Sequence, residues 1–104
     1  MAGRLIVLTN AAEGRDDEFN TWYDTIHLGE VLRLGPFTAA QRFRIGDDQM
    51  FPQTHRYVAL YDFDGEPQKA IDALQNGAET MNMSDAMADP MVIICEPIGP
   101  VVTA

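Results

Sequence analysis

A single cysteine, Cys95, excludes an internal disulfide framework, and a chain without disulfides suits a reducing cytoplasm. No run of residues approaches the roughly 18 consecutive apolar positions that a membrane-spanning helix needs. Near residue 1, one Arg precedes only a short apolar stretch, residues 5–8, which is too brief for the core of a signal peptide. We therefore expect a cytoplasmic protein that has no membrane partner.

Basic residues are also scarce, because 7 Lys and Arg stand against 16 Asp and Glu and give a formal net charge of −9. A surface of that sign repels phosphate backbones and anionic lipids, so nucleic acid is not an expected partner. The 104 residues suffice for one domain, expected to cover residues 1–104, with one hydrophobic core and little room for a deep private cavity.

Sequence motifs for bound cofactors are missing as well. There is no Gly-x-Gly-x-x-Gly pattern and no phosphate-binding loop. His27 has only Glu30 as a metal-ligating neighbour at helical spacing, and two ligands do not make a metal site. A lone His27 is compatible with haem, but no other residue supports haem binding. Ser84 and Cys95 lack the surroundings of a nucleophile. We expect no metal and no cofactor.

The apolar residues of the chain follow strand patterns in some segments and helical spacing in others. Residues 4–9 are a short apolar run, typical of a central buried strand. Residues 16–26 carry apolar side chains at i, i+3, i+4 and i+7, which predicts one buried helix face. Its members are Phe19, Trp22, Tyr23 and Ile26. Gly29 and the pair Gly35-Pro36 then interrupt the pattern, so we expect this helix to bend or fray between residues 27 and 34.

Residues 37–45 and 55–63 alternate as strands, and a polar hairpin loop, residues 46–53, joins them. Helical spacing returns from Pro67 to Ala78, and residues 91–95 form a last strand. The order β-α-β-β-α-β predicts an α+β, ferredoxin-like domain with a four-stranded antiparallel sheet.

Helices on one side of such a sheet cover only one of its faces, yet the first, third and last strands are apolar on both. A monomer would expose an apolar patch larger than monomers usually show, so we expect a homodimer that packs sheet against sheet. The same element order occurs in RNA-recognition domains, but "THRYVALYDF" lacks their glycines and the charge has the wrong sign. We reject that interpretation.

One stretch resembles a known family. The segment "FNTWYDTIHLGEVLRLGPFTAAQRFRI", answered by "HRYVALYDFDG", is similar to the EthD-like branch of the dimeric α+β barrel superfamily. The family pattern is a Trp-Tyr-x-x-x-His helix, a bend with Gly and Phe, an Arg-Phe strand and then Arg-Tyr-x-x-x-Tyr. The matching positions are Trp22, Tyr23, His27, Gly35, Phe37, Arg42, Phe43, Arg56, Tyr57 and Tyr61. Two departures affect the bend: Gly29 replaces a common Pro, and Gly35-Pro36-Phe37 replaces Pro-Gly-Phe.

The resemblance implies that two copies form a dimeric α+β barrel. Relatives include cofactor-free monooxygenases, lactone isomerases, polyketide cyclases and haem-binding enzymes, as well as members of unknown role. Fold-level analogy does not choose among these chemistries.

His27 and Tyr23 are the candidate catalytic residues. A His at the rim of the apolar stripe has a pKa range suited to a general acid or base. The structural alternative is a helix-ending His that bonds a carbonyl or pairs with Asp24 or Glu30. We expect Phe19, Trp22 and Ile26 to be buried against the sheet, Tyr23 and His27 to border a cavity, and Trp22 to close its floor.

Substrate-binding candidates are Trp22, Arg42, His55, Tyr57 and Tyr61. A His and Tyr hydroxyls that converge from one strand face could polarise a carbonyl, although His55 could equally lie in solvent. Arg42 either pairs with a carboxylate, which we favour, or holds an anionic substrate.

The leading hypothesis is a cofactor-independent enzyme that acts on a small hydrophobic, carbonyl-bearing compound by isomerisation, cyclisation, elimination or oxygenation. Its pocket would lie between the sheet and the first helix. The alternative is a non-catalytic binding or accessory protein with the same pocket, and a purely structural dimer comes third.

Overall fold

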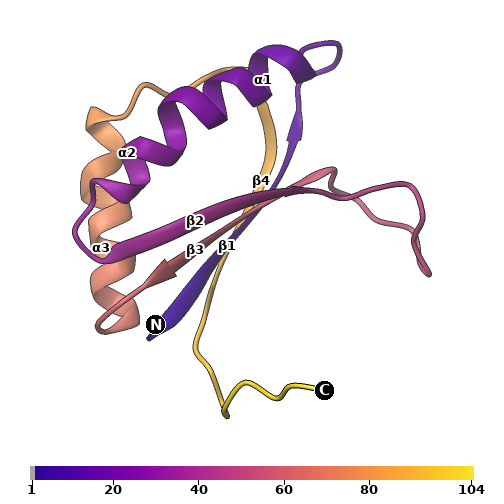
Figure 1. The fold of residues 1–104 in the computed structure, drawn as a ribbon. Helices are drawn as coiled ribbons and strands as arrows, with labels where there is room; N and C mark the ends of the chain where they lie inside the picture. The colour runs from indigo at the N-terminus through magenta and orange to yellow at the C-terminus, as the bar shows by residue number, and fades with distance from the viewer. Residues whose placement is uncertain (1) are drawn as a thin grey trace.

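The computed structural model describes residues 2–104. In chain order the elements are β1 (Gly3–Ala11), α1 (Asp16–Trp22), a π-helical turn (Tyr23–His27), α2 (Leu28–Leu32), β2 (Phe37–Arg44), β3 (Tyr57–Phe63), α3 (Pro67–Gly77), a 3-10 turn (Ala78–Thr80) and β4 (Met87–Cys95). The strands form one antiparallel sheet in the order β2-β3-β1-β4, and the helices lie on one side of it (Figure 1). The predicted ferredoxin-like α+β fold is confirmed.

Several boundaries differ from the predictions. β1 is longer than residues 4–9 at both ends, and β2 ends one residue early, at Arg44. β4 begins at Met87 rather than at residue 91, and β3 begins at Tyr57, which leaves His55 in the preceding loop. The first helix does not fray after His27, because α2 continues it to Leu32 with Gly29 inside a helical turn. Only the bend before Phe37 lies where the Gly35-Pro36 pair predicted it.

The first helix changes its winding at residues 23–27, where a π-helical turn closes i→i+5 hydrogen bonds. A π-helical turn contains about one residue more than an α-helical turn. Every later residue is therefore rotated back by about 100° around the helix axis, compared with its position in a regular α-helix. Ile26 is therefore turned outward and is 39% exposed, so the prediction that it is buried is wrong. His27 and Val31 turn inward instead and are 8% and 2% exposed.

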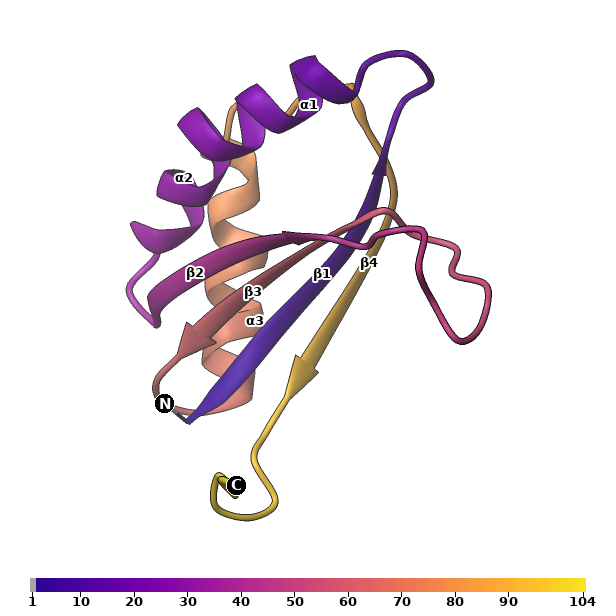
Figure 2. The ribbon, with the colours of Figure 1, turned by 45° about the vertical axis from the view of Figure 1, so that its right-hand side comes forward.

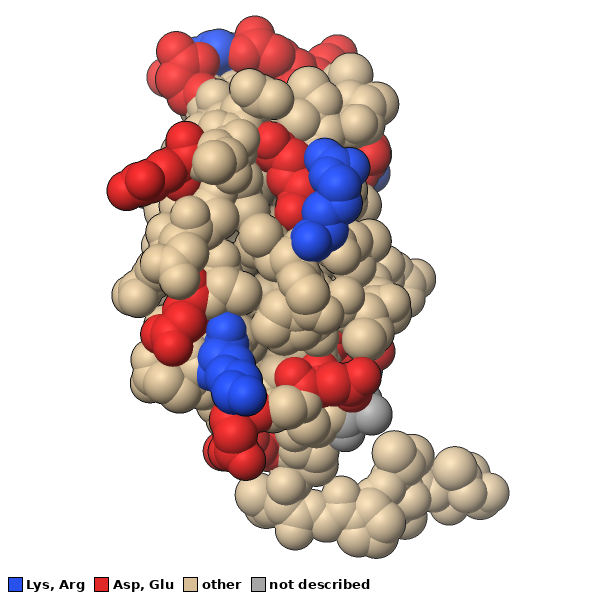
Figure 3. All heavy atoms as spheres, turned by 90° about the vertical axis from the view of Figure 1, so that its left-hand side faces the viewer, with Lys and Arg blue, Asp and Glu red and all other residues tan. Residues whose placement is uncertain are grey.

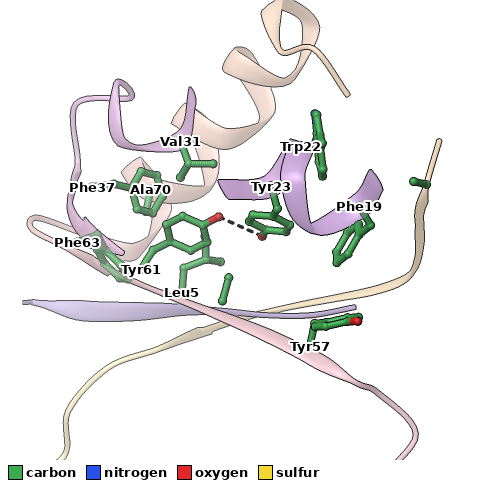
Figure 4. Packing of buried hydrophobic residues seen from close by; sticks show 12 residues of the cluster. Leu5, Phe19, Trp22, Tyr23, Val31, Phe37, Tyr57, Tyr61, Phe63 and Ala70 are labelled. Atoms are coloured by element: carbon green, nitrogen blue, oxygen red, sulfur yellow. Dashed lines mark hydrogen bonds between the residues drawn. The ribbon is translucent and has the colours of Figure 1, made fainter. Parts of the chain in front are cut away.

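The hydrophobic core lies between the helices and the sheet. Tyr57, Tyr61 and Phe63 alternate along β3, point to this side and are buried. Phe19 and Trp22 precede the π-helical turn and are buried as predicted, and the Phe19 ring lies 5.3 Å from that of Tyr57 between centroids. Figure 4 shows these aromatic side chains meeting between helix and strand. The core is consequently aromatic, and large rings fill it.

The other side of the sheet, here called the open face, carries no helix (Figure 2). The strand register places three rows of four residues on it, because residues directly opposite one another share a face. The rows are Ala39, Asp62, Arg4 and Cys95; Gln41, Leu60, Ile6 and Ile93; and Phe43, Val58, Leu8 and Met91. The smallest dimension of the molecule is 19 Å, which fits one sheet layer and one helix layer of about 10 Å each.

Candidate functional site

His27 ends the π-helical turn and is held by a residue one turn further on. Its Nδ1 lies 3.3 Å from Oε1 of Glu30, whose Oε2 accepts a 2.6 Å hydrogen bond from the backbone N–H of Asn82. The Trp22 indole stacks on the imidazole with ring centroids 4.6 Å apart. Glu30 thus fixes the ring, and Nε2 of His27 has no hydrogen-bond partner within residues 2–104.

This environment sets the protonation of His27. Burial lowers the pKa of the imidazole, although the hydrogen bond and the charge of Glu30 act in the opposite direction. The ring is therefore neutral at pH 7. Because the Glu30 carboxylate accepts a hydrogen bond, the hydrogen sits on Nδ1 and the lone pair on Nε2. A neutral, oriented imidazole with a free lone pair has the properties of a general base.

Two tyrosine hydroxyls meet beside this histidine. The Tyr61 hydroxyl donates to that of Tyr23 at 3.0 Å, and Figure 4 shows the two groups pointing toward one another between sheet and helix. The edge of the Tyr23 ring system packs against His27 with centroids 4.9 Å apart. Burial raises the pKa of Tyr23 and of Tyr61, so both phenols stay neutral and act as hydrogen-bond donors.

The hydroxyl pair is incompletely satisfied. Every side-chain nitrogen and oxygen of residues 2–104 that is fully shielded from solvent has a hydrogen-bond partner, but two hydroxyls that share one bond use only one of their two hydrogens. The hydrogen of the Tyr23 hydroxyl has no acceptor among the described residues. A buried donor without an acceptor costs about 1–3 kcal/mol.

Arg42 covers this pair from β2. Its guanidinium carbon lies 4.4 Å above the Tyr23 ring, and its two terminal nitrogens donate to Asp24 at 2.8 Å and to Asn20 at 2.7 Å. Pairing of Arg42 with a helix carboxylate, the alternative that the sequence favoured, is confirmed. The same guanidinium faces an open cavity on its other side.

That cavity, here called the helix-side cavity, has a volume of about 650 Å³ and lies between the first helix and β2. It is lined by Asp17, Asn20 and Asp24 from the helix and by Arg42, Arg44 and Tyr57 from the strands, among others. Two of the predicted substrate-binding residues, Arg42 and Tyr57, therefore meet here. Tyr23 and His27 do not line this cavity, and Arg42 stands between it and Tyr23.

A second cavity of about 680 Å³ lies between the end of β1 and the β2–β3 loop, and His55 lines it. The His55 ring nitrogens pair with the Thr54 hydroxyl and with the Asp89 carbonyl, each at 3.0 Å. The prediction that His55 starts a strand beside Tyr57 is wrong. The Asn10 side chain donates a hydrogen bond to the backbone carbonyl of Thr54 and accepts one from the backbone N–H of Arg56. These are groups that hydrogen-bond along a strand.

The predicted site residues therefore lie at three separate places in the structure. Trp22, Tyr23, His27 and Tyr61 form one buried aromatic group, Arg42 and Tyr57 border the helix-side cavity, and His55 lies at the second cavity. Their roles in binding and catalysis stay predictions.

Sequence reasoning missed two residues that hold Arg42 in place, Asn20 and Asp24. Their spacing of i, i+4 sets them on one helix face and was the available signal. For Glu30, the sequence indicated a metal-ligating neighbour of His27 and one of two alternative carboxylate partners, but not its bond to the backbone of Asn82.

Within residues 2–104, no three or more His, Cys, Asp or Glu side chains gather as a metal site would require. No helix in the same part of the chain is long and apolar enough to cross a membrane.

No family model and no curated protein matches the chain. Solved structures do. HapK from Hahella chejuensis aligns with a TM-score of 0.71 and 14% identity over 98% of each chain. An ethyl tert-butyl ether D (EthD) family protein from Bacillus halodurans aligns at 0.68 and 15%, covering 94% of this chain and 100% of its own. The heme-degrader MhuD from Mycobacterium tuberculosis, with two hemes bound in its active site, aligns at 0.65 and 15%, covering 96% and 99%.

At such identities the likeness concerns the course of the backbone alone, and it extends over almost all of every chain compared. The strand order and the one-sided helices agree with it. The chain therefore has a ferredoxin-like α+β fold, as its sequence pattern implied, and it shares this backbone course with the EthD family protein and the other solved structures.

Proposed function

We propose that this chain forms a homodimer and acts, without a cofactor, on small hydrophobic compounds that bear a carbonyl group. His27 is the acid/base in this proposal, and Tyr23 donates a hydrogen bond to the carbonyl oxygen. The observation that carries the proposal is the hydroxyl hydrogen of Tyr23, which is buried and has no acceptor within residues 2–104.

A carbonyl oxygen is the partner that this hydrogen lacks. The Tyr61 hydroxyl fixes the orientation of the Tyr23 hydroxyl, so a donor is ready before the ligand arrives. The rings around it are apolar, and the raised pKa of Tyr23 keeps its proton in place. A hydrophobic molecule with one carbonyl group matches a site that is aromatic apart from a single free donor.

His27 supplies the proton transfer. In the proposed step, Nε2 of the neutral imidazole takes a proton from the carbon next to the carbonyl. The electron pair of the broken C–H bond moves into an enolate, whose oxygen accepts the Tyr23 hydrogen bond. Glu30 stabilises the imidazolium that forms. Where the enolate is conjugated with a C=C bond, the proton returns from Nε2 to the far carbon of that bond, the double bond shifts, and an isomerisation results. Where the enolate carbon attacks a second carbonyl of the same molecule, a C–C bond forms, the proton goes from Nε2 to the alkoxide oxygen, and a ring closes. Neither route needs an oxidant.

Access runs through the helix-side cavity. The Arg42 side chain lines that cavity and also covers the Tyr23 ring, and hydrogen bonds to Asp24 and Asn20 hold it there. A ligand that displaces or slides beneath the guanidinium would reach the hydroxyl pair. Arg42 then keeps its positive charge close to the enolate oxygen.

Haem does not fit the residues at this site. The helix-side cavity has no His, Cys or Met among its lining residues, and its one phenol, Tyr57, donates to Asp16 at 2.6 Å. We derive no step through haem.

The homodimer is supported by surface area. The chain exposes 7013 Å², whereas a monomer of 11.5 kDa exposes about 5,800 Å². The excess of about 1,200 Å² exceeds the roughly 800 Å² that each partner buries in a standard interface. Phe43, Met91 and Ile93 on the open face are each at least one-third exposed, which a second copy would relieve.

Charge also favours a second copy on the open face. Two chains of net charge −9 repel each other, and Figure 3 shows acidic side chains at several places on the helix-bearing side. Among the twelve residues of the open face only Arg4 and Asp62 are charged, and they form an ion pair at 2.9 Å. That face therefore carries no net charge to oppose contact.

The enzyme is tested by deuterium exchange in D2O. NMR would follow the hydrogens next to the carbonyl in a panel of hydrophobic ketones, lactones and quinone-like compounds. We expect the protein to catalyse exchange in at least one of them. His27→Gln should slow it by about 10²- to 10⁴-fold without change of fold, and Tyr23→Phe should slow it and weaken binding.

Two other outcomes are informative. A compound that binds but shows no exchange above background supports the alternative, a non-catalytic binding protein. One observation favours this alternative. The helix-side cavity and the second cavity are both open without any movement of Arg42. Exchange that falls with His55→Gln and not with His27→Gln would move the chemistry to the second cavity and contradict the proposal.

The dimer is tested by sedimentation at micromolar concentration, where twice the chain mass of 11.5 kDa is expected. Ile93→Asp should dissociate it. Val92→Asp is the matched control. Val92 directly precedes Ile93 in β4, its side chain is more exposed than that of Ile93, and it lies on the helix-bearing side of the sheet. A single species of 11.5 kDa for the unaltered chain contradicts the homodimer.

A further inference from the structure

Two segments extend beyond the body of the protein. The first, here called the tail arm, is residues 97–104, which follow β4 and Glu96. It contains no charged residue, although the chain as a whole is strongly acidic. Ile98, Val101 and Val102 are 105%, 88% and 89% exposed, so they touch almost nothing of their own chain. The tail arm projects from the body in both ribbon views and again in Figure 3.

The second segment, here called the hairpin arm, is residues 46–53 between β2 and β3. Its apolar tip consists of Met50 and Phe51, which are 91% and 71% exposed. Figures 1 and 2 show it beyond the end of the sheet opposite to the end from which the tail arm leaves. In both views the two arms extend away from the helices, toward the side of the open face.

The arms matter because the open face alone is small for an interface. It offers twelve residues, about half of the 20–30 residues that each partner contributes to a standard interface. Each arm adds residues at one end of that face. The radius of gyration, 14.4 Å, also exceeds the value of about 13 Å for a compact chain of this length, as extended arms require.

From these observations we infer that the hairpin arm and the tail arm of each protomer pack against the second copy and form the rim of its interface. This inference rests on the homodimer proposed above. In a two-fold dimer the same patch faces itself, so arms at opposite ends of one open face each reach a fixed place on the partner. The tail arm and the Met50-Phe51 tip carry no charged side chain, so burying them adds no repulsion between two acidic chains. Asp47 and Asp48 of the hairpin arm lie outside that tip, and Asp47 pairs with Arg56.

Dissociation constants from sedimentation velocity over a concentration series test the arms. Val102→Asp and Phe51→Asp each replace an apolar arm residue by a charge. Thr103→Asp and Gln53→Asp are matched controls, because they place the same charge one and two residues away on polar positions. We expect each arm variant to raise the dimer dissociation constant by about 10- to 100-fold and each control to change it less than about threefold.

The outcomes separate the arms from the dimer itself. If Ile93→Asp dissociates the dimer while both arm variants leave the dissociation constant unchanged, the homodimer stands and the arms are refuted. If an arm variant lowers the thermal stability of the monomer and not the affinity, that arm packs on its own chain, which also overturns the inference. A chain that is monomeric throughout the series refutes both proposals.

Discussion

The two faces of the sheet differ in chemistry as well as in cover. The helix side holds polar groups at fixed places within an aromatic core, namely the Tyr23 and Tyr61 hydroxyls and the His27 imidazole. The open face is mostly apolar, and its only charges, Arg4 and Asp62, neutralise each other. Fixed polar groups among rings suit recognition of a small molecule, whereas a mostly apolar surface without net charge suits contact with a like surface. One sheet thus separates two proposed functions.

The largest expected effect is a loss of stability on the helix side. Trp22→Ala removes a buried indole that stacks on His27 and donates a 2.6 Å hydrogen bond to the Asn82 carbonyl. We expect the free energy of unfolding to fall by about 3 kcal/mol or more, as in other core truncations. Urea unfolding should show this loss at nanomolar and micromolar protein concentration alike.

Phe43→Ala on the open face is the matched comparison. Phe43 is 42% exposed in one chain, so its truncation should cost little where monomers prevail. At micromolar concentration the loss should grow, because a partner that binds only the folded state stabilises it by mass action. Equal losses for both variants at nanomolar concentration would remove the distinction between the two faces.

The sheet was predictable because its information is local. Alternation along β3 separates Tyr57, Tyr61 and Phe63 from Val58 and Leu60, and a two-residue period leaves only one way to bury the aromatic set. The two-sided apolar strands likewise indicate a sheet face that the helices leave uncovered. The strand ends are less predictable, because side-chain hydrogen bonds such as those of Asn10 to the Thr54 and Arg56 backbone also act there.

The π-helical turn could not be read from the sequence. Nothing in Tyr-Asp-Thr-Ile-His distinguishes a wide turn from a regular one, since Phe19, Trp22 and Tyr23 fit either winding. What favours the wide turn is distant in the chain: Glu30 reaches the backbone of Asn82 only when His27 and Glu30 both face inward. A tertiary contact therefore sets a local conformation, and it carries the candidate base with it.

A smaller effect is expected from pH. The folded pKa of His27 lies below its ordinary value of 6.5, so as pH falls through about 6.5 the unfolded chain takes up a proton while the folded chain stays neutral. The free energy of unfolding should therefore decline below that pH, down to the folded pKa. Urea unfolding between about pH 7.5 and 5 should show a shallower decline in His27→Gln. His55 remains in both proteins, and equal slopes would contradict a buried neutral His27.

The smallest expected effect tests whether the Tyr23 hydroxyl serves stability or a ligand. Tyr23→Phe leaves the Tyr61 hydroxyl without its acceptor and removes one hydrogen bond, for which we expect a loss of about 1 kcal/mol. The double variant Tyr23→Phe with Tyr61→Phe removes both polar groups and should be close to neutral. Thermal and urea unfolding of the four proteins then give the coupling energy of the pair.

Ligand binding distinguishes the two single variants, which unfolding alone does not. Either single substitution removes the same hydrogen bond, but only Tyr23→Phe removes the donor that has no acceptor in the folded chain. Binding of a carbonyl compound should therefore weaken more in Tyr23→Phe than in Tyr61→Phe, even where both unfold alike. If Tyr23→Phe instead costs about 3 kcal/mol or more and leaves binding unchanged, the hydroxyl is part of the scaffold. The helix side would then be a core like any other, and the proposed division between the two faces would fail.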